Sequence, residues 1–269
     1  MQIIGYKWKN GDSWSPKLIT IEDDRIRFHD LFDKDISMKI GGLYCIGYFT
    51  NGKRSPCPTN EKLEKGTVCK ACEEKDYYHK CLGCSGECIN EKHRETCKDT
   101  TFYTYLTTFG PLLKVGISQE HRFFERMIEQ GAELGIKFGR IKDGKEARQL
   151  EQRIKRLLLC EDRVYGDTKE RHMFGDPNAV MLKLRNALET IQKFGMSSIN
   201  TEIYDFRKYY KLNNVTKQPK PIIINTGTVI EGTVIAAKGN LLILKKGDDF
   251  YTINVHRLVA RAVLSFSII

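Results

Sequence analysis

Alternation of apolar and polar residues at the start of the chain predicts short β-strands. The segments 17–21 (Lys-Leu-Ile-Thr-Ile) and 25–28 (Arg-Ile-Arg-Phe) alternate in this way. Asn-Gly-Asp at 10–12 and Gly-Gly at 41–42 interrupt the pattern as turns do. We therefore expect residues 1–56 to form a β-rich N-terminal region.

The middle of the chain continues as strands and then changes to a helical period. Segments 101–106 and 112–117 have strand composition, and the Phe-Gly-Pro sequence between them predicts a hairpin. Apolar residues then recur every three or four positions, which predicts three helices. We expect the first to run from a cap at Ser118 to a stop at Gly131, the second to begin near Gly144, and the third to run from Asp176 and Pro177 to Gly195.

The last part of the chain again has a strand pattern. Residues 213–221 are polar and interrupted by proline, which is typical of a linker. Beyond them, apolar segments alternate with turns at 238–240 and 247–249, which predicts a small antiparallel β-barrel. The expected fold is α+β, with a β-rich region at 1–56, a Cys-rich module at 57–100, a central α/β domain with a helical extension at 101–212, and the barrel at 222–269.

Composition limits the classes of protein to consider. The chain has 269 residues, enough for about two domains at roughly 150 residues each. It has no apolar run of about 18 residues, and Lys7 interrupts any secretory signal, so we expect a cytoplasmic protein without a membrane partner. The 44 Lys and Arg residues exceed the 34 Asp and Glu residues, which gives a net charge of +10. This excess favours nucleic acid, RNA or DNA, as partner, although a solvated basic surface is an alternative.

Eight of the nine cysteines lie between Cys45 and Cys97, in a segment with few aliphatic residues. Disulfides are rare in the cytoplasm, and a Cys-x2-Cys pair directs two thiolates toward one tetrahedral ion, so this segment predicts structural zinc. Cys160 lies in an apolar run and is expected to be a core residue. The predicted zinc ligands are Cys57, Cys69, Cys72, Cys81, Cys84, Cys88 and Cys97.

The division of these ligands between sites stays open at this point. Seven cysteines can close one site and leave ligands over, or close two sites if His79 or His93 supplies an eighth ligand. The spacing Cys81-x2-Cys84-x3-Cys88 also suits an iron–sulfur cluster, which is the weaker alternative.

Basic residues concentrate in segment 137–156, where eight of them stand against three acidic residues. The resulting net charge of +5 is half of the excess of the whole chain. Such a cluster suits a phosphate backbone, although a solvated helix face has the same composition. The candidate nucleic-acid contacts are Arg122, Arg140, Lys142, Lys145, Arg148 and Arg153.

Glu151 is the most informative charged residue of the second predicted helix. It lies four residues after Ala147 and three before Ile154, so its carboxylate lies on the apolar face. An ionised group there needs a partner, which can be a metal ion, Arg148 or the incoming Arg126. Its position therefore predicts either a metal ligand or a buried salt bridge.

Tyr103 and Tyr105 on the first strand, Arg126 on the next helix and Glu151 on the following one occur in an order that resembles the GIY-YIG nuclease superfamily. The resemblance covers about residues 101–160. It implies a metal-dependent nuclease in which Glu151 holds one Mg²⁺ or Mn²⁺ ion, Arg126 stabilises charge on the reacting phosphate, and one tyrosine orients water. Lys114 stands in the place of the family's second tyrosine, which implies a base or a phosphate contact.

A second resemblance covers most of the chain. The cysteine cluster, the Lys-Val-Gly-Ile segment at 114–117, and Arg126 followed by Gln-Gly-Ala at 130–132 are similar to a family of zinc-containing prokaryotic proteins of unknown function. Three hypotheses follow: a zinc-stabilised, GIY-YIG-like nuclease; a non-catalytic factor that binds RNA or ribosomes on a nuclease-like fold; and an adaptor that binds another protein.

Overall fold

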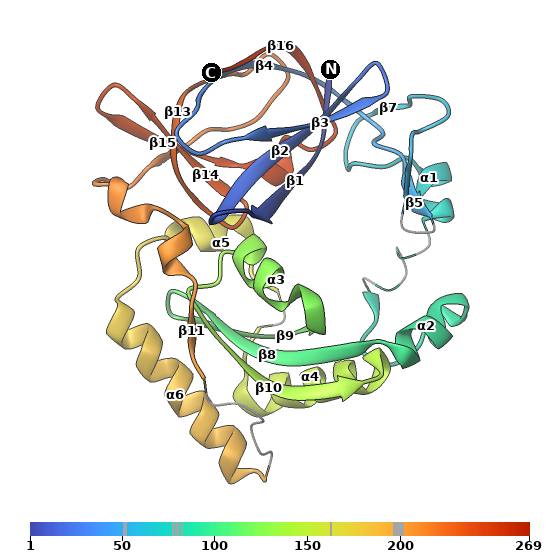
Figure 1. The fold of residues 1–269 in the computed structure, drawn as a ribbon, viewed down its shortest axis with the longest axis vertical. Coiled ribbons are helices and arrows are strands. Elements are labelled where there is room, and N and C mark those ends of the chain that lie inside the picture. Colours follow the sequence, from blue (N-terminus) through green and yellow to red (C-terminus); the bar gives the residue numbers. More distant parts are fainter. Residues whose placement is uncertain (51–52, 77, 79–80, 82, 162, 196–201) are drawn as a thin grey trace. The chain divides into compact units, whose positions relative to one another are not determined.

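The computed structural model describes residues 1–50, 53–76, 78, 81, 83–161, 163–195 and 202–269. The chain divides into two compact units (Figure 1). The first consists of Met1–His79 and Tyr209–Ile269, and the second of Lys80–Lys208. The fold is α+β and rich in sheet, in agreement with the expectation from the sequence.

The first unit is built on one mixed sheet, ordered β12-β15-β14-β13-β4-β16-β1-β2-β3, with β7 paired to β4. The pairs along this path are antiparallel except for β12 with β15. The strands are β1 (Gln2–Asn10), β2 (Trp14–Glu22), β3 (Arg25–Asp30), β4 (Asp35–Tyr44), β7 (Lys62–Leu63), β12 (Lys220–Pro221), β13 (Val229–Lys238), β14 (Leu241–Lys246), β15 (Asp249–Asn254) and β16 (Arg261–Ile268).

The C-terminal strands do not form the closed barrel that the sequence predicts. Among the described strands, the order of the sheet has free ends at β12 and β3. Instead, β4 lies between β13 and β16, with Lys39 opposite Val229 and Met38 opposite Phe266. The apolar positions at 222–269 therefore pack in the same sheet as residues 1–44. Alternation identifies a strand but not its partner, so the sequence pattern alone does not distinguish these two arrangements.

Short elements of the first unit surround the end of β4. The strands β5 (Tyr48–Thr50) and β6 (Lys53–Ser55) pair with each other, and helix α1 (Lys70–Lys75) follows β7. Three-residue 3₁₀ helices complete the C-terminal part of the chain: η4 (Arg207–Tyr209), η5 (Leu212–Asn214) and η6 (Val255–Arg257).

The second unit has a four-stranded sheet ordered β11-β10-β8-β9. Helix α3 covers one face of this sheet, and α4 and α6 cover the other (Figure 1). Leu106, Val115 and Ile136 of the sheet pack with Ile154 of α4 and Leu184 of α6 in the core. The elements are β8 (Thr101–Phe109), β9 (Leu112–Gln119), β10 (Leu134–Lys142), β11 (Tyr204–Asp205), η2 (Glu91–His93), α2 (Arg94–Asp99), η3 (Glu120–Arg122), α3 (Phe123–Gln130), α4 (Gly144–Leu158), α5 (Gly166–Arg171) and α6 (Pro177–Lys193).

The predicted hairpin and helices of this unit are confirmed with one exception. β8 pairs with β9, α4 begins at Gly144, and Asp176 caps α6 by accepting a hydrogen bond from the Asn178 backbone. The exception is Ser118, which lies in β9 opposite Tyr103 and caps no helix. The β8–β9 ladder extends through this residue, so α3 begins only at Phe123.

None of the helices in the described ranges combines the length and the apolar composition of a membrane span.

Candidate functional site

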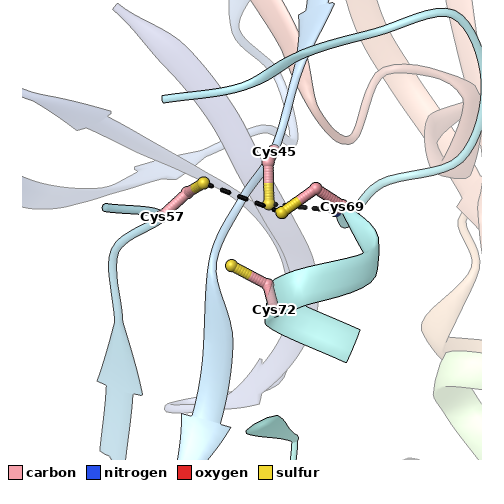
Figure 2. Close-up of side chains that lie close together, drawn as sticks. All are labelled: Cys45, Cys57, Cys69 and Cys72. Carbon is pink, nitrogen blue, oxygen red and sulfur yellow. Dashed lines mark hydrogen bonds between the residues drawn. The ribbon is translucent and has the colours of Figure 1, made fainter. Parts of the chain in front are cut away.

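Four cysteines from separate segments meet in the first unit (Figure 2). Cys45 follows β4, Cys57 follows β6, and Cys69 and Cys72 lie at the start of α1. All four Sγ atoms lie within 4.8 Å of one another, and those of Cys57 and Cys69 are 3.9 Å apart. The β4 end, the β5–β6 hairpin and α1 therefore bring a complete set of four sulfur ligands to one place.

This geometry fits a tetrahedral metal ion. Zn–S bonds of about 2.3 Å in a tetrahedron place the sulfur atoms about 3.8 Å apart, close to the separation of Cys57 and Cys69. Four thiolates form a closed structural site and suit a soft ion such as Zn²⁺, whereas Mg²⁺ prefers oxygen ligands. The four cysteines can therefore hold a metal ion, and their chemistry is that of structural zinc.

Backbone hydrogen bonds orient the sulfur of Cys45. The N–H groups of Gly47 and Cys69 donate to this sulfur at 3.4 and 3.2 Å. The Cys72 N–H donates to the Cys69 carbonyl at 3.1 Å and closes the turn between these two ligands. Gly47 has a positive φ of 81°, and a Cβ added there would collide with the Ser55 carbonyl oxygen. Glycine is thus required two residues after Cys45.

The thiols of this cluster differ in their pKa. Burial raises the pKa of Cys69 and Cys72. Desolvation also opposes the ionisation of Cys57, but hydrogen bonds from Glu61 and Thr59 outweigh it and lower its pKa to about 6. Four clustered thiolates without a cation would repel one another, and a bound metal ion removes that penalty.

Three of the predicted zinc ligands, Cys57, Cys69 and Cys72, lie in this cluster, and the sequence analysis missed the fourth. Cys45 belongs to the dense run of eight cysteines but lies outside the Cys-x2-Cys pairs, three residues after the Gly-Gly sequence that was expected to be a turn. That expectation was wrong, because Gly41 and Gly42 lie inside β4. The even count of eight was the signal that could have identified Cys45. Among the described residues no further group of three ligands lies within this distance, so the ligand role of Cys81, Cys84, Cys88 and Cys97 stays a prediction. His79 lies outside the described residues.

A buried polar cluster lies between the sheet of the second unit and α3. Lys114 donates to the Gln130 side-chain oxygen, and the Gln130 amide donates to the Tyr105 hydroxyl at 2.9 Å. The Tyr105 side chain is fully buried. Gly116 lies opposite Tyr105 on β9 and leaves space for this hydroxyl. Sequence reasoning predicted Tyr105 and Lys114 as site residues but missed Gln130, which joins them.

Arg126 and Glu151 extend this cluster. Glu151 is only 2% exposed and accepts a hydrogen bond from Arg148 at 2.7 Å. The pKa of Arg126 is raised mainly by its interaction with Tyr105, with smaller contributions from the carboxylates of Glu129 and Glu151. Its buried Nε–H has no hydrogen-bond partner among the described residues. Tyr105, Lys114, Arg126 and Glu151 therefore belong to one electrostatic neighbourhood, and the salt bridge with Arg148 is present.

Tyr103 belongs to a second polar group on the same sheet. Its hydroxyl donates to Glu120 at 2.8 Å, and Arg140 donates to both oxygens of this carboxylate at 2.8 and 3.0 Å. Hydrogen bonds from Arg140 and Tyr103 lower the pKa of Glu120 to about 2. The Lys137 ammonium lies 4.7 to 5.2 Å from the ring centroids of Tyr103, Phe123, Phe124 and Tyr204.

Comparison with known proteins gives one family. Residues 35–263 match the family described as a protein of unknown function, DUF2797. The chain belongs to the DUF2797 family. Searches of curated proteins and of solved structures give no match. The family description assigns no activity, so the roles of the residues in the polar cluster stay predictions.

Most of the predicted nucleic-acid contacts of this DUF2797 protein form ion pairs within the chain. Arg122 contacts Glu125 and Glu129, Arg140 contacts Glu120, Lys142 contacts Asp99, and Arg148 contacts Glu151. Within the described ranges, Lys145 and Arg153 of α4 form no ion pair. These two residues therefore keep a positive charge that a protein carboxylate does not compensate.

Gly116→Ala is expected to destabilise this DUF2797 protein by about 1–3 kcal/mol, as overpacking in a buried site does. The added Cβ would collide with the Tyr105 hydroxyl and lie 2.5 Å from its Cζ atom. Denaturant unfolding measures the change. Gly11→Ala is the matched control, because a Cβ at Gly11 meets no atom within 4 Å. Equal unfolding midpoints for the two variants would contradict the tight packing of Tyr105 on Gly116.

Proposed function

We propose that this protein is a zinc-stabilised nucleic-acid-binding protein that contacts the phosphate backbone through its second unit. The observation that carries the proposal is the basic segment 137–156, where several cations, Lys145 and Arg153 of α4 among them, take part in none of the ion pairs of the described residues. Cations that are not neutralised by neighbouring carboxylates release counterions when phosphates bind. The net charge of +10 adds a long-range attraction for any polyanion.

The identity of the metal belongs to the same proposal. The cluster of Cys45, Cys57, Cys69 and Cys72 supports zinc because all four ligands are sulfur and three of them are buried. In this proposal the ion is structural: it connects the end of β4 to the hairpin and α1, and it takes no part in chemistry at the second unit.

Replacing Lys145 and Arg153 together by glutamine tests the binding proposal. Each phosphate contact contributes about 0.9 to the slope of log affinity against log salt on duplex DNA and about 0.7 on single strands. We expect the double variant to bind labelled RNA or DNA more weakly and with a slope smaller by about 1.4 to 1.8. Fluorescence anisotropy at several salt concentrations gives this slope directly.

Lys7→Gln combined with Lys9→Gln is the matched control, since it removes the same charge from exposed positions on β1 of the first unit. The control is expected to keep the wild-type slope. Identical slopes for both double variants would place the binding surface elsewhere. Absence of binding at low salt, with one protein copurifying, would favour the adaptor hypothesis.

A second candidate function is divalent-metal-dependent cleavage of phosphodiester bonds. The observation that favours it is the electrostatic interaction of Arg126 with Tyr105 and Glu151, the residues that the GIY-YIG resemblance selects. In this proposal Glu151 holds Mg²⁺ or Mn²⁺, and Arg126 stabilises negative charge that develops on the phosphate. Lys114 is held by Gln130 and would act as a positioning residue for Tyr105 through that amide.

The burial of this cluster distinguishes the two candidate functions, binding of nucleic acid alone and binding with cleavage. Tyr105 is fully buried and Arg148 already occupies one oxygen of Glu151, so a substrate phosphate would have to displace local contacts. Binding without cleavage would correspond to the factor that binds RNA or ribosomes on a nuclease-like fold. Binding with cleavage would require that the cluster opens when nucleic acid and the divalent ion are present.

A further inference from the structure

We propose that Cys81, Cys84, Cys88 and Cys97 bind a second structural zinc ion, within the second unit of the chain. This inference is independent of the proposed nucleic-acid function. It begins from the division of the chain, because each compact unit contains four of the eight clustered cysteines. The first set is complete with Cys45, so no histidine is needed to provide an eighth ligand.

The pair Cys81 and Cys84 makes the same backbone hydrogen bond as the Cys69 and Cys72 pair of the first cluster. The Cys84 N–H donates to the Cys81 carbonyl at 3.3 Å, and the Cys72 N–H donates to the Cys69 carbonyl at 3.1 Å. This turn directs two thiolates toward one ion. The Asn90 amide donates to the Cys81 sulfur at 3.3 Å, which is the kind of hydrogen bond that orients a metal ligand.

The remaining two cysteines interact electrostatically with neighbouring groups of the same segment. Cys97 belongs to α2 and interacts electrostatically with Cys84, and Arg94 interacts electrostatically with both Cys88 and Cys97. Arg94 is itself fixed by two hydrogen bonds to Asp143, at 2.8 and 2.6 Å. One guanidinium therefore interacts with two of the four cysteines and is fixed to Asp143, directly before α4.

Among the described residues of segment 81–99, no hydrophobic side chain is buried. Neither η2 nor α2 contains a buried residue. Helices of three and six residues are too short to be stable by themselves. The four sulfur atoms do not lie within 4.8 Å of one another, so zinc binding would draw the Cys81–Cys84 turn toward Cys88 and Cys97. Metal binding would then supply the folding free energy that apolar burial does not.

The second zinc ion would also anchor α4. The sulfur of Cys97 lies against the backbone of Gly144, in the first turn of α4. A Cβ on Gly144 would lie 2.5 Å from that sulfur, so the close approach requires glycine. Because α4 carries Glu151, metal binding at Cys97 would position the helix on which the polar cluster depends.

Metal analysis of the full chain by mass spectrometry tests the proposal. We expect two zinc ions per chain in the wild type and one in the variant Cys84→Ser/Cys97→Ser. The matched control is Cys160→Ala, because Cys160 is a buried cysteine of the same unit outside the proposed site, and it should keep two ions. One zinc ion in the wild type, or two in the double variant, would overturn the proposal. Iron and sulfide in the wild type would overturn it in favour of a cluster.

A measurement on the wild type covers the case in which the double variant does not fold. Metal-free protein is titrated with Co²⁺ and with Zn²⁺, and cysteine alkylation is mapped by peptide mass spectrometry. We expect an end point at two equivalents and protection of all eight clustered cysteines. Protection confined to Cys45, Cys57, Cys69 and Cys72, with an end point at one equivalent, would overturn the second site and leave the first intact.

Discussion

Cys45→Ser is expected to release the metal ion from the first unit and to destabilise the sheet to which the site is attached. Cys45 directly follows β4, a strand that pairs with both β13 and β16. Serine keeps the size of the side chain but replaces a thiolate by a neutral hydroxyl, so a closed four-sulfur site becomes a three-sulfur site. Apparent binding free energies of structural zinc reach about 10–16 kcal/mol at neutral pH, so losing one of four ligands has a large effect.

The expected zinc affinity of Cys45→Ser is at least about 100-fold below that of the wild type, the upper end of the loss seen when a residue that merely orients a ligand is replaced. Competition with a chromogenic chelator measures this change, and thermal unfolding measures the stability. Cys160→Ala is the matched control, since it removes a buried cysteine from outside the cluster. Unchanged zinc affinity in Cys45→Ser would show that three cysteines and an exchangeable ligand hold the ion.

The position of Cys45 in the structure shows which metal ligands the spacing of cysteines can and cannot identify. Cys69-x2-Cys72 predicts a pair of ligands because two residues of one turn must point to the same side. Cys45 and Cys57 join this pair through tertiary structure: one follows a central strand and the other follows a two-stranded hairpin. Cys45 and Cys69 are 24 residues apart in the sequence, and no local pattern indicates that they meet.

The sheet of the first unit illustrates the same limit. The strands within 229–268 follow from alternation and from glycine turns, and Gly239 and Gly247 have the positive φ that such turns need. Their partner β4 begins nearly 200 residues earlier in the chain, as the pair of Asp35 with Thr233 shows. A local pattern predicts each strand, whereas the choice between a separate barrel and one shared sheet depends on long-range pairing.

The helices of the second unit were predicted best because their signals are local. The Asp176 cap, the Pro177 first turn and the apolar stripe of α6 all lie within one segment. The burial of Glu151 also followed from helical periodicity, and its pairing with Arg148 was one of the alternatives that the sequence left open. Gln130 was missed because its contacts with Lys114 and Tyr105 join three elements, and no periodic pattern indicates such a contact.

Glu151→Gln is expected to abolish cleavage of RNA or DNA in Mg²⁺ or Mn²⁺ while binding is kept, if the proposed phosphodiester cleavage occurs. Glutamine has nearly the same shape but lacks the negative charge that would hold a divalent ion. We expect the rate to fall by about 100-fold or more, the scale on which the loss of one charge-stabilising group lowers catalysis. Cleavage of labelled oligonucleotides measures the rate, and fluorescence anisotropy confirms binding.

Arg148→Gln is the control that separates the metal from the salt bridge. Both variants break the same ion pair, which joins Arg148 Nη1 to Glu151 Oε2 at 2.7 Å, but only one removes the carboxylate. A buried carboxylate without its cation needs another positive charge, so Mg²⁺ or Mn²⁺ should raise the melting temperature of Arg148→Gln more than that of Glu151→Gln. Equal loss of cleavage in both variants would mean that Glu151 acts by positioning α4. Cleavage by Arg148→Gln alone would assign the ion to Glu151.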